Sequence, residues 1–390
     1  MWVWMMPMSP CELNWQTRKA MTKSVRIGIV GCGSVMRGPY TNQIKRIQQM
    51  GLPVEVTMTC DVTPEGAQTA QRLWPGAEFV QDYQAVAASS DVDIMLVTTA
   101  MQMHGVIAKA GLEGGKHVLV EKPMAPTLAE GKELLELAQR SKTILHPAPH
   151  VVLSPTFQKI ARHIQNGDIG KPYLARAFYG WSGPTWGKWF YQPGGGSLFD
   201  LGVYNVTSLT ALMGPAKRVT ALAGTAIPER MVDNEMTKVQ VVDNAHVNID
   251  FGESVYGLVT TGFTIQKYRT PALEIYGSEG TIQMLGDDWD PDGYELWTNK
   301  RGVWELHEET DPNWPWTDGL RHLVECILTG TKPMITAEHG YHVLEIMLKA
   351  EEAGRSGMIQ TIDSTFTPPD FSDAGKAKGP VSHDRTREED

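Results

Sequence analysis

The chain has 390 residues, of which 42% are hydrophobic and 21% are charged, and its formal net charge is −10. This length and apolar content allow one or two sizeable cores, and the length predicts about two domains. A nucleic-acid partner would require a basic stripe, and runs such as Arg18-Lys19 are too short to form one, so we expect no nucleic-acid partner.

The first twenty residues differ in character from the rest of the chain. The apolar run Met1 to Met8 is short and no basic residue precedes it, so it resembles neither an export signal nor a membrane span. We therefore expect residues 1–20 to form a disordered extension, Met21 to begin the first domain, and no membrane to be involved.

The number and spacing of the cysteines indicate the redox state of the cellular compartment. Four of them are scattered along the chain, at Cys11, Cys32, Cys60 and Cys326. This spacing predicts no disulfide framework and favours a reducing compartment, so we expect a cytoplasmic protein.

A strand, a glycine turn and a helix start succeed one another from residue 25. Residues 25–30 form a β-rich apolar run, and Gly31-Cys32-Gly33 comes directly after it. Glycines in such a turn let the backbone approach a pyrophosphate at the amino end of the helix. The pattern predicts a dinucleotide site contacted by Gly31, Gly33, Ser34 and Val35. Met36 stands where the motif expects a third glycine, so we expect the helix to start late or to lie farther out.

Asp61 ends a second predicted strand, residues 54–60. An acidic residue at this place usually hydrogen-bonds the adenosine ribose, about 20 residues after the glycines. Asp61 lies 28 residues after Gly33, which a long first helix through Ile44 and Ile47 explains. No arginine comes next to neutralise a 2′-phosphate, which favours NAD over NADP. The alternative is that Asp61 only starts a turn.

Lys122 lies at the carboxyl end of a short buried strand, residues 117–120, after another predicted strand at residues 93–97. Ligands of open parallel sheets bind in the crevice beyond this end of the strands. Lys122, in Glu121-Lys122-Pro123, is therefore predicted to point at the cofactor. The alternative is an ordinary surface turn.

The chain changes character once, near His146. Before it, strands alternate with helices such as residues 128–140; after about Val151 the sequence is rich in strands. The later predicted strands are residues 245–251, 255–264, 273–276, 281–285 and 303–306. We predict an α/β fold with a Rossmann dinucleotide-binding domain over residues 21–147, then an α+β domain with a large, mainly antiparallel open sheet over residues 148–365 and a flexible tail over residues 366–390.

These motifs together resemble the Gfo/Idh/MocA family of oxidoreductases. The resemblance rests on the order of the glycine turn, Asp61, His104, Glu121-Lys122-Pro123 and the segment from Gly194 to Tyr204, and it covers about residues 25–354. It implies oxidation or reduction of sugars, inositols or related cyclic diols with NAD or NADP, in a homo-oligomer, dimer or tetramer, joined through the second domain's sheet. It also implies that Thr98, Thr99, His104, Glu121 and Lys122 lie at the cofactor.

Three positions depart from the usual family pattern. Thr99-Ala100-Met101 replaces a common Thr-Pro-Asn, which removes a polar contact to the cofactor ribose. Tyr204 stands where many members carry histidine. Tyrosine occupies this place in members resembling glucose-fructose oxidoreductase and dimeric dihydrodiol dehydrogenase. Thr207 replaces an aspartate, so we do not expect the Asp-His pair of inositol dehydrogenases.

The predicted catalytic residues are Lys122, Tyr204 and Asp200. Removing a hydride from a secondary alcohol requires loss of its hydroxyl proton, and a positioned base contributes about 10²–10⁴-fold. A nearby ammonium is expected to lower the pKa of Tyr204 toward the working pH. Whether Lys122 or Tyr204 touches the substrate hydroxyl stays open. Asp200 comes four residues before Tyr204 and would share its face of a helix over residues 197–212; its alternative role is that of a helix-start carboxylate.

Further predicted substrate contacts come from aromatic and histidine side chains, and each has a structural alternative. Rings can stack on the C–H faces of sugars, and the predicted contacts are Trp181, Trp186, Trp189 and His150. The tryptophans could equally pack in the core or between subunits, and His150 could be structural. No metal site is expected, because His, Cys and carboxylates show no convincing ligand spacing.

We therefore predict an NAD-dependent dehydrogenase that oxidises a secondary hydroxyl of a sugar, glycoside or related cyclic polyol. One alternative is NAD-assisted redox cleavage of glycosides. Another is a non-catalytic protein that senses a dinucleotide or a sugar, against which the presence of both Lys122 and Tyr204 argues.

Overall fold

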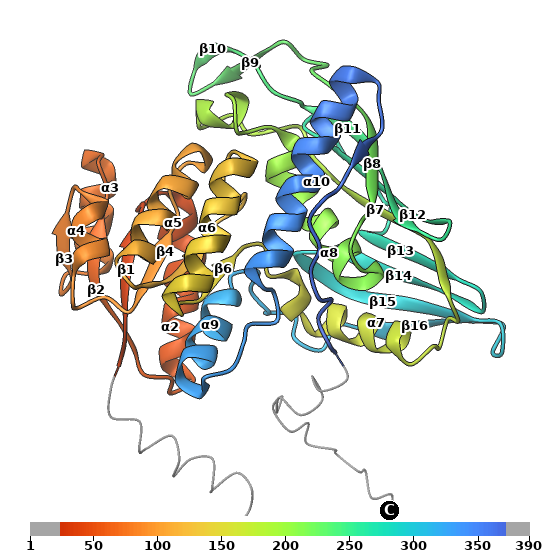
Figure 1. Ribbon diagram of the computed structural model, residues 1–390, viewed down its shortest axis with the longest axis horizontal. Helices are drawn as coiled ribbons and strands as arrows, with labels where there is room; N and C mark the ends of the chain where they lie inside the picture. Colours follow the sequence, from red (N-terminus) through yellow and green to blue (C-terminus); the bar gives the residue numbers. More distant parts are fainter. Residues whose placement is uncertain (1–23, 372–390) are drawn as a thin grey trace, which may run out of the picture.

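The computed structural model describes residues 24–371, which form two sheets with helices between and around them (Figure 1). The predictions for residues 1–20, for a domain start at Met21 and for the tail beyond residue 371 lie outside the described residues. No helix between residues 24 and 371 combines the length and the apolar character that crossing a membrane requires.

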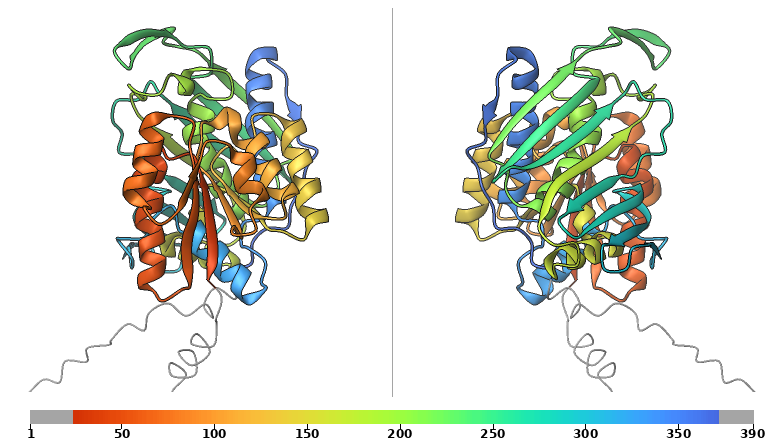
Figure 2. Two further views of the ribbon diagram at one scale, coloured as in Figure 1. Left: turned by 90° about the vertical axis from the view of Figure 1, so that its left-hand side faces the viewer. Right: turned by 90° about the vertical axis from the view of Figure 1, so that its right-hand side faces the viewer.

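The first sheet has six strands in the order β3-β2-β1-β4-β5-β6, and every neighbouring pair is parallel. Its strands are β1 Val25–Val30, β2 Val54–Cys60, β3 Glu78–Val80, β4 Ile94–Val97, β5 His117–Val120 and β6 Leu145–Pro147. Helices cover both faces (Figure 2, left). They are η1 Met36–Tyr40, α2 Thr41–Gln49, α3 Pro64–Leu73, α4 Tyr83–Ala88, η2 Met101–Met103, α5 His104–Glu113 and α6 Leu128–Ser141. This is the predicted Rossmann arrangement, and the carboxyl ends of the parallel strands share one edge.

The first helix differs from a regular one where Met36 replaces the third glycine. Residues Met36–Tyr40 form a π-helical turn with Pro39 inside it, and the α-helix α2 begins only at Thr41. Since Met36 is buried, its side chain occupies the space that a glycine would leave for close contact between helix and strand. The late helix start agrees with the prediction.

The second sheet has nine strands in the order β16-β15-β14-β13-β7-β12-β11-β8-β17. Only the pair of β7 and β12 is parallel, so the sheet is mixed and mainly antiparallel. Its strands are β7 Pro172–Gly180, β8 Arg218–Gly224, β11 Asn244–Gly252, β12 Val255–Gly262, β13 Leu273–Gly277, β14 Gly280–Asp287, β15 Asp290–Thr298, β16 Trp304–Glu308 and β17 Gln360–Thr361, with a separate hairpin of β9 Glu229–Val232 and β10 Glu235–Lys238.

Helices lie on the inner face of this sheet, between it and the first sheet (Figure 1). The remaining elements are η3 Val151–Leu153, α7 Pro155–Gln165, η4 Lys188–Tyr191, η5 Leu198–Gly202, α8 Val203–Met213, α9 Gly319–Thr329 and α10 Ala337–Ser356. The outer face carries no helix from residues 24–371 (Figure 2, right). Side chains alternate accordingly: Ala175 and Ala177 are buried, whereas Leu174 and Arg176 are exposed.

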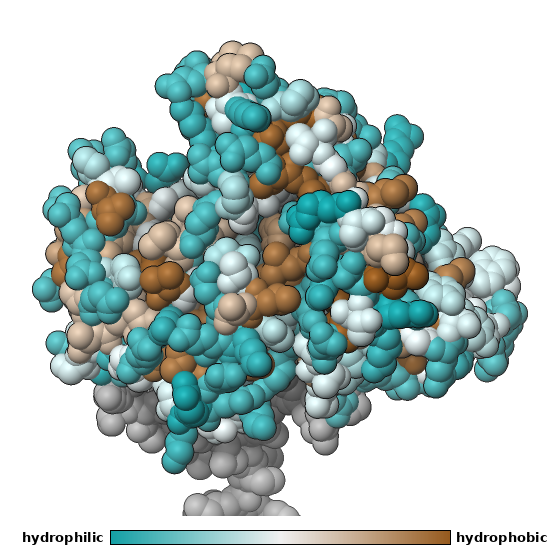
Figure 3. All heavy atoms as spheres, turned by 45° about the horizontal axis from the view of Figure 1, so that its top comes forward, coloured by the Kyte–Doolittle hydropathy of each residue, from teal (hydrophilic) through white to brown (hydrophobic). Residues whose placement is uncertain are grey.

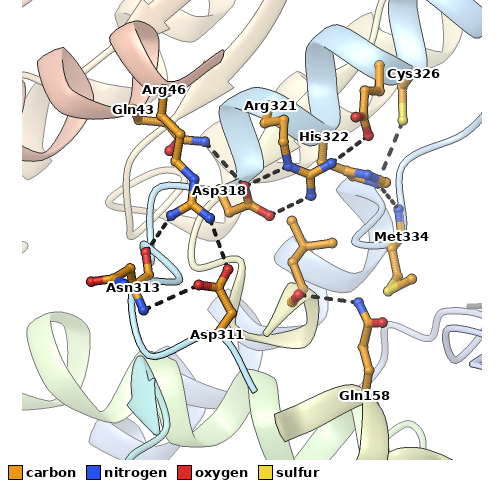
Figure 4. A network of polar contacts seen from close by, with 12 residues as sticks. Gln43, Arg46, Gln158, Asp311, Asn313, Asp318, Arg321, His322, Cys326 and Met334 are labelled. Atoms are coloured by element: carbon orange, nitrogen blue, oxygen red, sulfur yellow. Dashed lines mark hydrogen bonds and ion pairs between the residues drawn. The ribbon is translucent and has the colours of Figure 1, made fainter. Parts of the chain in front are cut away.

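The chain returns to the first domain through α9, which packs with α2 on one face of the parallel sheet. Leu320 and Leu323 of α9 share a core with Ile44 and Ile47 of α2. Polar contacts tie the same elements together (Figure 4). The Gln43 amide donates to Asp318 Oδ1 at 3.2 Å, and Arg321 Nε donates to the same oxygen at 2.8 Å. α9 therefore joins the two domains.

The predicted flexible tail is wrong for its first residues. Phe366 stacks on His339 with ring centroids 4.0 Å apart, and Phe371 is fully buried against Phe157. The backbone N–H of Phe371 also donates to Gln165 Oε1 at 3.2 Å. Residues 366–371 are packed because two large aromatic side chains close the core there.

Candidate active site

The glycine turn leaves the amino end of the first helix open. Gly31 has φ +98°, and a Cβ there would lie 2.7 Å from the Thr98 carbonyl carbon, so only glycine fits. A Cβ on Gly33 would meet nothing within 4 Å, and Gly33 and Ser34 are exposed while Val35 is half-buried. The exposed backbone at this helix start suits the phosphates of a dinucleotide.

Asp61 lies beside this turn at the end of β2. Its Oδ2 accepts from the Cys32 backbone N–H at 2.7 Å, and its Oδ1 accepts from the N–H and hydroxyl of Thr63 at 2.8 and 2.7 Å. Gly66 leaves the required space, because a Cβ there would lie 2.0 Å from Asp61 Cγ. The carboxylate is thus fixed near the turn and keeps acceptor capacity for ribose hydroxyls. These residues fit the adenosine half of NAD.

Thr98 and Thr99 directly follow β4, and His104 is buried. Thr98 is buried and its hydroxyl donates to the Gly31 carbonyl at 2.6 Å, while Thr99 is half-buried. His104 is 1% exposed, with its two ring nitrogens 2.8 Å from the Pro123 carbonyl and 3.0 Å from the Thr99 carbonyl. Burial lowers its pKa. His104 was predicted to lie at the cofactor; it instead ties together the loops that come after β4 and β5.

Glu121 is held by a residue that the sequence did not single out. The Tyr40 hydroxyl donates to Glu121 Oε1 at 2.6 Å, and the Lys122 backbone N–H donates to Oε2 at 3.2 Å. Glu121 is 6% exposed and Tyr40 is fully buried. Tyr40 comes from the π-helical turn, 81 residues away, so no local pattern could have indicated the pair.

Lys122 meets the later glycine-rich segment at the junction of the domains. Its Nζ donates to Asp200 Oδ1 at 2.6 Å and to the Asp200 carbonyl at 2.9 Å. The same Nζ lies 5.2 Å from the centroid of the Tyr204 ring. The structure therefore brings the three predicted catalytic residues together.

The helix that carries Asp200 and Tyr204 is irregular at its start. Leu198–Gly202 form a π-helical turn and the α-helix α8 runs from Val203 to Met213, where the sequence predicted one helix over residues 197–212. π-Turns of this kind often occur at functional sites. The turn directs the Asp200 carbonyl as well as its carboxylate toward Lys122.

The predicted lowering of the Tyr204 pKa is wrong. Burial raises the pKa of Tyr204 well above its ordinary value, and the carboxylates of Glu121, Asp200 and Asp288 act in the same direction. The Lys122 ammonium lies near the ring centroid and is balanced by Asp200. The Tyr204 phenol is therefore protonated in this structure, and its hydroxyl makes no hydrogen bond to any residue in the range 24–371.

Asp288 is a buried carboxyl group next to α8 that the sequence did not reveal. Its Oδ2 accepts from Asn205 and Ser208 of α8, both at 3.0 Å, and its Oδ1 has no partner among the described residues. Burial raises its pKa to about 7. Asp288 comes directly after β14, and only the packing of that strand's end against α8 places it here.

The three predicted tryptophans have different surroundings. Trp181 is half-buried at the end of β7 and lines a cavity with Tyr179. Trp186 is 49% exposed, and Trp189 stacks on Phe190 with centroids 3.7 Å apart. Of the three, Trp181 has the surroundings of a ligand contact.

His150 is not on a surface that a substrate can reach in this structure. It is 1% exposed, its ring lies 4.2 Å from that of His146, and Gly319 packs directly against it. Neither ring nitrogen has a partner among the described residues, and burial lowers the His150 pKa to about 3. The predicted substrate contact is corrected to a buried structural position. Within residues 24–371, no three His, Cys, Asp or Glu side chains are grouped to hold a metal ion.

Comparison with known proteins shows that each of the two domains matches a described family. Residues 25–148 match the family described as "Oxidoreductase family, NAD-binding Rossmann fold", and residues 157–283 match the "GFO/IDH/MocA C-terminal domain". The two matches together span more than half of the chain.

Individual relatives of known name have low sequence identity to this chain. The scyllo-inositol 2-dehydrogenase (NADP(+)) IolW of Bacillus subtilis is 25% identical over 359 residues, covering 85% of this chain and 94% of its own. The 1,5-anhydro-D-fructose reductase of Ensifer adhaerens is 26% identical over 348 residues, covering 87% and 99%. A solved levoglucosan dehydrogenase in complex with NADH and levoglucosan has the same fold, with a TM-score of 0.79, 19% identity, and coverage of 88% of this chain and 100% of that one.

Proposed function

Because the chain belongs to the Gfo/Idh/MocA family of oxidoreductases, with an NAD-binding Rossmann domain, we propose that it oxidises a secondary hydroxyl of a sugar, glycoside or related cyclic polyol by hydride transfer. The glycine turn and Asp61 would hold the dinucleotide, and NAD, when bound, would supply the hydride acceptor. The rest of the chemistry belongs to side chains at the junction of the two domains.

The observation that carries this proposal is a pair of unused donors. Lys122 Nζ has three N–H donors and uses two of them on Asp200, which leaves one for a substrate oxygen. The Tyr204 hydroxyl has no partner within residues 24–371. Two convergent donors beside the carboxyl end of β5 suit the oxygen of an alcohol that is becoming a carbonyl.

The protonated state of Tyr204 assigns the two roles. A phenol whose pKa is raised can donate a hydrogen bond but is a poor proton acceptor at neutral pH. We therefore assign proton transfer to Lys122: in oxidation the hydroxyl proton passes to its nitrogen, and in reduction the same nitrogen returns it. Asp200 orients the amine, and Tyr204 holds the substrate oxygen.

The substrate class is proposed from the relatives together with the site. Their names specify a scyllo-inositol dehydrogenase, a 1,5-anhydro-D-fructose reductase and a levoglucosan dehydrogenase. The ligands so named are ring compounds with several oxygens. Tyr179 and Trp181 offer aromatic surface to a ligand close to Tyr204.

A substrate screen tests the function. Sugars, glycosides, inositols and anhydrosugars are incubated with the protein and NAD, NADH formation is followed by absorbance, and products are mapped by NMR. We expect at least one cyclic polyol to give a ketone at a ring carbon. Absence of any turnover in either direction, while NADH fluorescence shows a bound cofactor, would reject the proposal.

We further propose that two copies meet through the outer face of the nine-stranded sheet. Leu174, Leu222 and Tyr256 on this face are 50%, 80% and 46% exposed, and apolar surface of this kind marks contact sites. Leu222→Asp should then shift sedimentation toward the monomer.

The described cysteines, Cys32, Cys60 and Cys326, are buried free thiols, in keeping with the proposed reducing, cytoplasmic environment.

A further inference from the structure

A cavity of about 500 Å³ lies beside the catalytic residues, at the end of the nine-stranded sheet. Its walls come from the end of β7, from the segment that connects β12 to β13, and from the ends of β14 and β15 that face each other. This volume lies within the usual range of small-molecule sites, about 300–1,000 Å³. The face of the molecule that is seen with the top of Figure 1 turned forward carries hydrophobic patches among hydrophilic side chains (Figure 3).

The cavity shares a wall with the catalytic site. The Tyr179 ring lines it and meets the Tyr204 ring edge-on, with centroids 6.0 Å apart. Lys122 Nζ lies on the same Tyr204 ring. A ligand in the cavity would therefore be separated by a single aromatic ring from the residue that holds the reacting oxygen.

The connecting segment is anchored, so the cavity is a built feature. The Tyr268 ring packs on Phe178 with centroids 4.7 Å apart, and its hydroxyl donates to Asp287 Oδ1 at 2.6 Å. These contacts hold the neighbouring Lys267 and Arg269 at the rim. Both cations are exposed, and neither forms an ion pair within residues 24–371.

The chemistry of the lining selects the ligand. Lys267 and Arg269 contribute two positive charges, and Asp287 and Asp292 contribute two negative charges, so the charged groups sum to zero. A phosphate or carboxylate would be repelled by the aspartates and a cation by the basic residues. Sugar hydroxyls can donate to aspartate and accept from lysine or arginine. The aromatic Tyr179 and Trp181 offer apolar surface to the C–H face of a ring.

We propose that this cavity is a glycosyl subsite: it binds a second, uncharged sugar ring attached to the ring that is oxidised, so the preferred substrate is a disaccharide or a glycoside of similar size. This inference rests on the proposed function, because it takes the oxidised ring to lie at Lys122 and Tyr204. It narrows the substrate class from cyclic polyols in general to two-ring glycosides.

The test compares matched substrates and matched variants. NADH formation is measured with glucose, methyl glucoside, maltose and cellobiose, and with galactose, methyl galactoside and lactose. We expect kcat/KM for the best disaccharide to exceed that of its monosaccharide by about tenfold or more, mainly through a lower KM. The double variant Lys267→Ala/Arg269→Ala should remove most of this advantage and leave the monosaccharide value unchanged.

The control variant is Lys300→Ala/Arg301→Ala. It removes the same residue types and the same charge from the exposed turn at the other end of β15, away from the cavity. It should keep the disaccharide advantage. Equal kcat/KM values for one-ring and two-ring substrates, or equal behaviour of the two double variants, would overturn the subsite.

A binding measurement distinguishes an error in the proposed subsite from an error in the proposed function. Saturation-transfer NMR of maltose, cellobiose and lactose is recorded with NADH-loaded wild type and both double variants. If no sugar is oxidised, the proposed function fails, while selective loss of disaccharide signal in Lys267→Ala/Arg269→Ala still supports the subsite. If sugars are oxidised but no disaccharide signal depends on Lys267 and Arg269, only the subsite is rejected.

Discussion

At the scale of single residues, Lys122 and Tyr204 have different proposed roles: Lys122 transfers the proton, and Tyr204 donates a hydrogen bond to the substrate oxygen. Asp200 takes two of the three Lys122 donors, and the ammonium lies close to the Tyr204 ring. Tyr204 is surrounded by carboxylates that disfavour its ionisation. A positioned amine and a neutral phenol are therefore expected to respond differently to substitution.

Lys122→Met should abolish turnover and leave NADH binding within about an order of magnitude, because the glycine turn and Asp61 are the residues proposed to hold the phosphates and the ribose. Turnover and NADH fluorescence titration provide the measurement. Lys109→Met, at a half-buried lysine of α5 that pairs with Glu133, is the control and should behave as wild type. A Lys122→Met enzyme with more than about a tenth of wild-type kcat would remove this amine from proton transfer.

Tyr204→Phe should lower kcat by about 10²-fold, because the substrate oxygen loses one donor. The oxidation rate should rise with pH in wild type, and this pH limb should keep its position in the variant, because the Tyr204 phenol is not the titrating group. Rate–pH profiles of both proteins, with Tyr173→Phe at an exposed position of β7 as control, measure this. If the pH-dependent limb disappears in Tyr204→Phe, the Tyr204 phenol and not Lys122 is the group that takes the proton.

At the scale of elements, the loop between β2 and α3 determines how Asp61 is presented. Thr63 caps α3 by accepting from the Gly66 N–H at 3.0 Å, and it also donates to Asp61. The helix start, the cap and the carboxylate thus form one unit. Because a Cβ at Gly66 would lie 2.0 Å from Asp61 Cγ, the side chain and the helix cannot keep this arrangement if residue 66 becomes larger.

Wild type should prefer NAD over NADP by at least about tenfold in kcat/KM, roughly 1.4 kcal/mol, because Asp61 is proposed to accept from ribose hydroxyls and would repel a 2′-phosphate. Gly66→Ala should reduce this preference severalfold by displacing Asp61. Gly76→Ala is the matched control, since a Cβ there meets nothing within 4 Å. Equal cofactor preference in wild type and Gly66→Ala would show that Asp61 does not select the cofactor.

At the scale of the whole molecule, buried histidines make the fold sensitive to acid. His146, His150 and His322 cluster where the domains join, and His339 and His342 lie under the residues that precede Phe371. Burial lowers the pKa of all five, to about 3 for His150 and His339 and about 4 for His322 and His342. Asp288, whose pKa is raised to about 7, has the opposite effect on stability.

The free energy of unfolding should fall as pH drops from about 6.5 to 4. Between these values the unfolded chain binds protons that the buried histidines of the folded chain do not, with a slope of up to about 1.4 kcal/mol per pH unit for each histidine. Urea unfolding at pH 7.5, 6.5, 5.5 and 4.5 measures the slope. His150→Phe should flatten it, while His246→Gln, at an exposed position of β11, should not. A free energy of unfolding that is constant down to pH 4.5 would contradict the conclusion that these histidines are buried in their neutral form.

Much of the fold could be predicted from local patterns. Runs such as residues 25–30 and 54–60 are β-rich, the glycine turn comes directly after the first of them, and Glu121-Lys122-Pro123 ends a buried strand. Each of these signals lies within a few residues, because periodicity and turn chemistry report what one segment needs. The family and the cofactor class were predicted from the order of these motifs, and the matched domains confirm both.

Tertiary structure alone decided the electrostatics of the site and the burial of its neighbours. Burial raises the pKa of Tyr204, and Glu121, Asp200 and Asp288, from three separate parts of the chain, act in the same direction. His104 was expected at the cofactor and His150 at the substrate, with a structural histidine as the alternative for His150. Both are buried, and Gly319 packs against His150. A pKa depends on charges and solvent in all directions, and a single segment of sequence specifies only its own side of that environment.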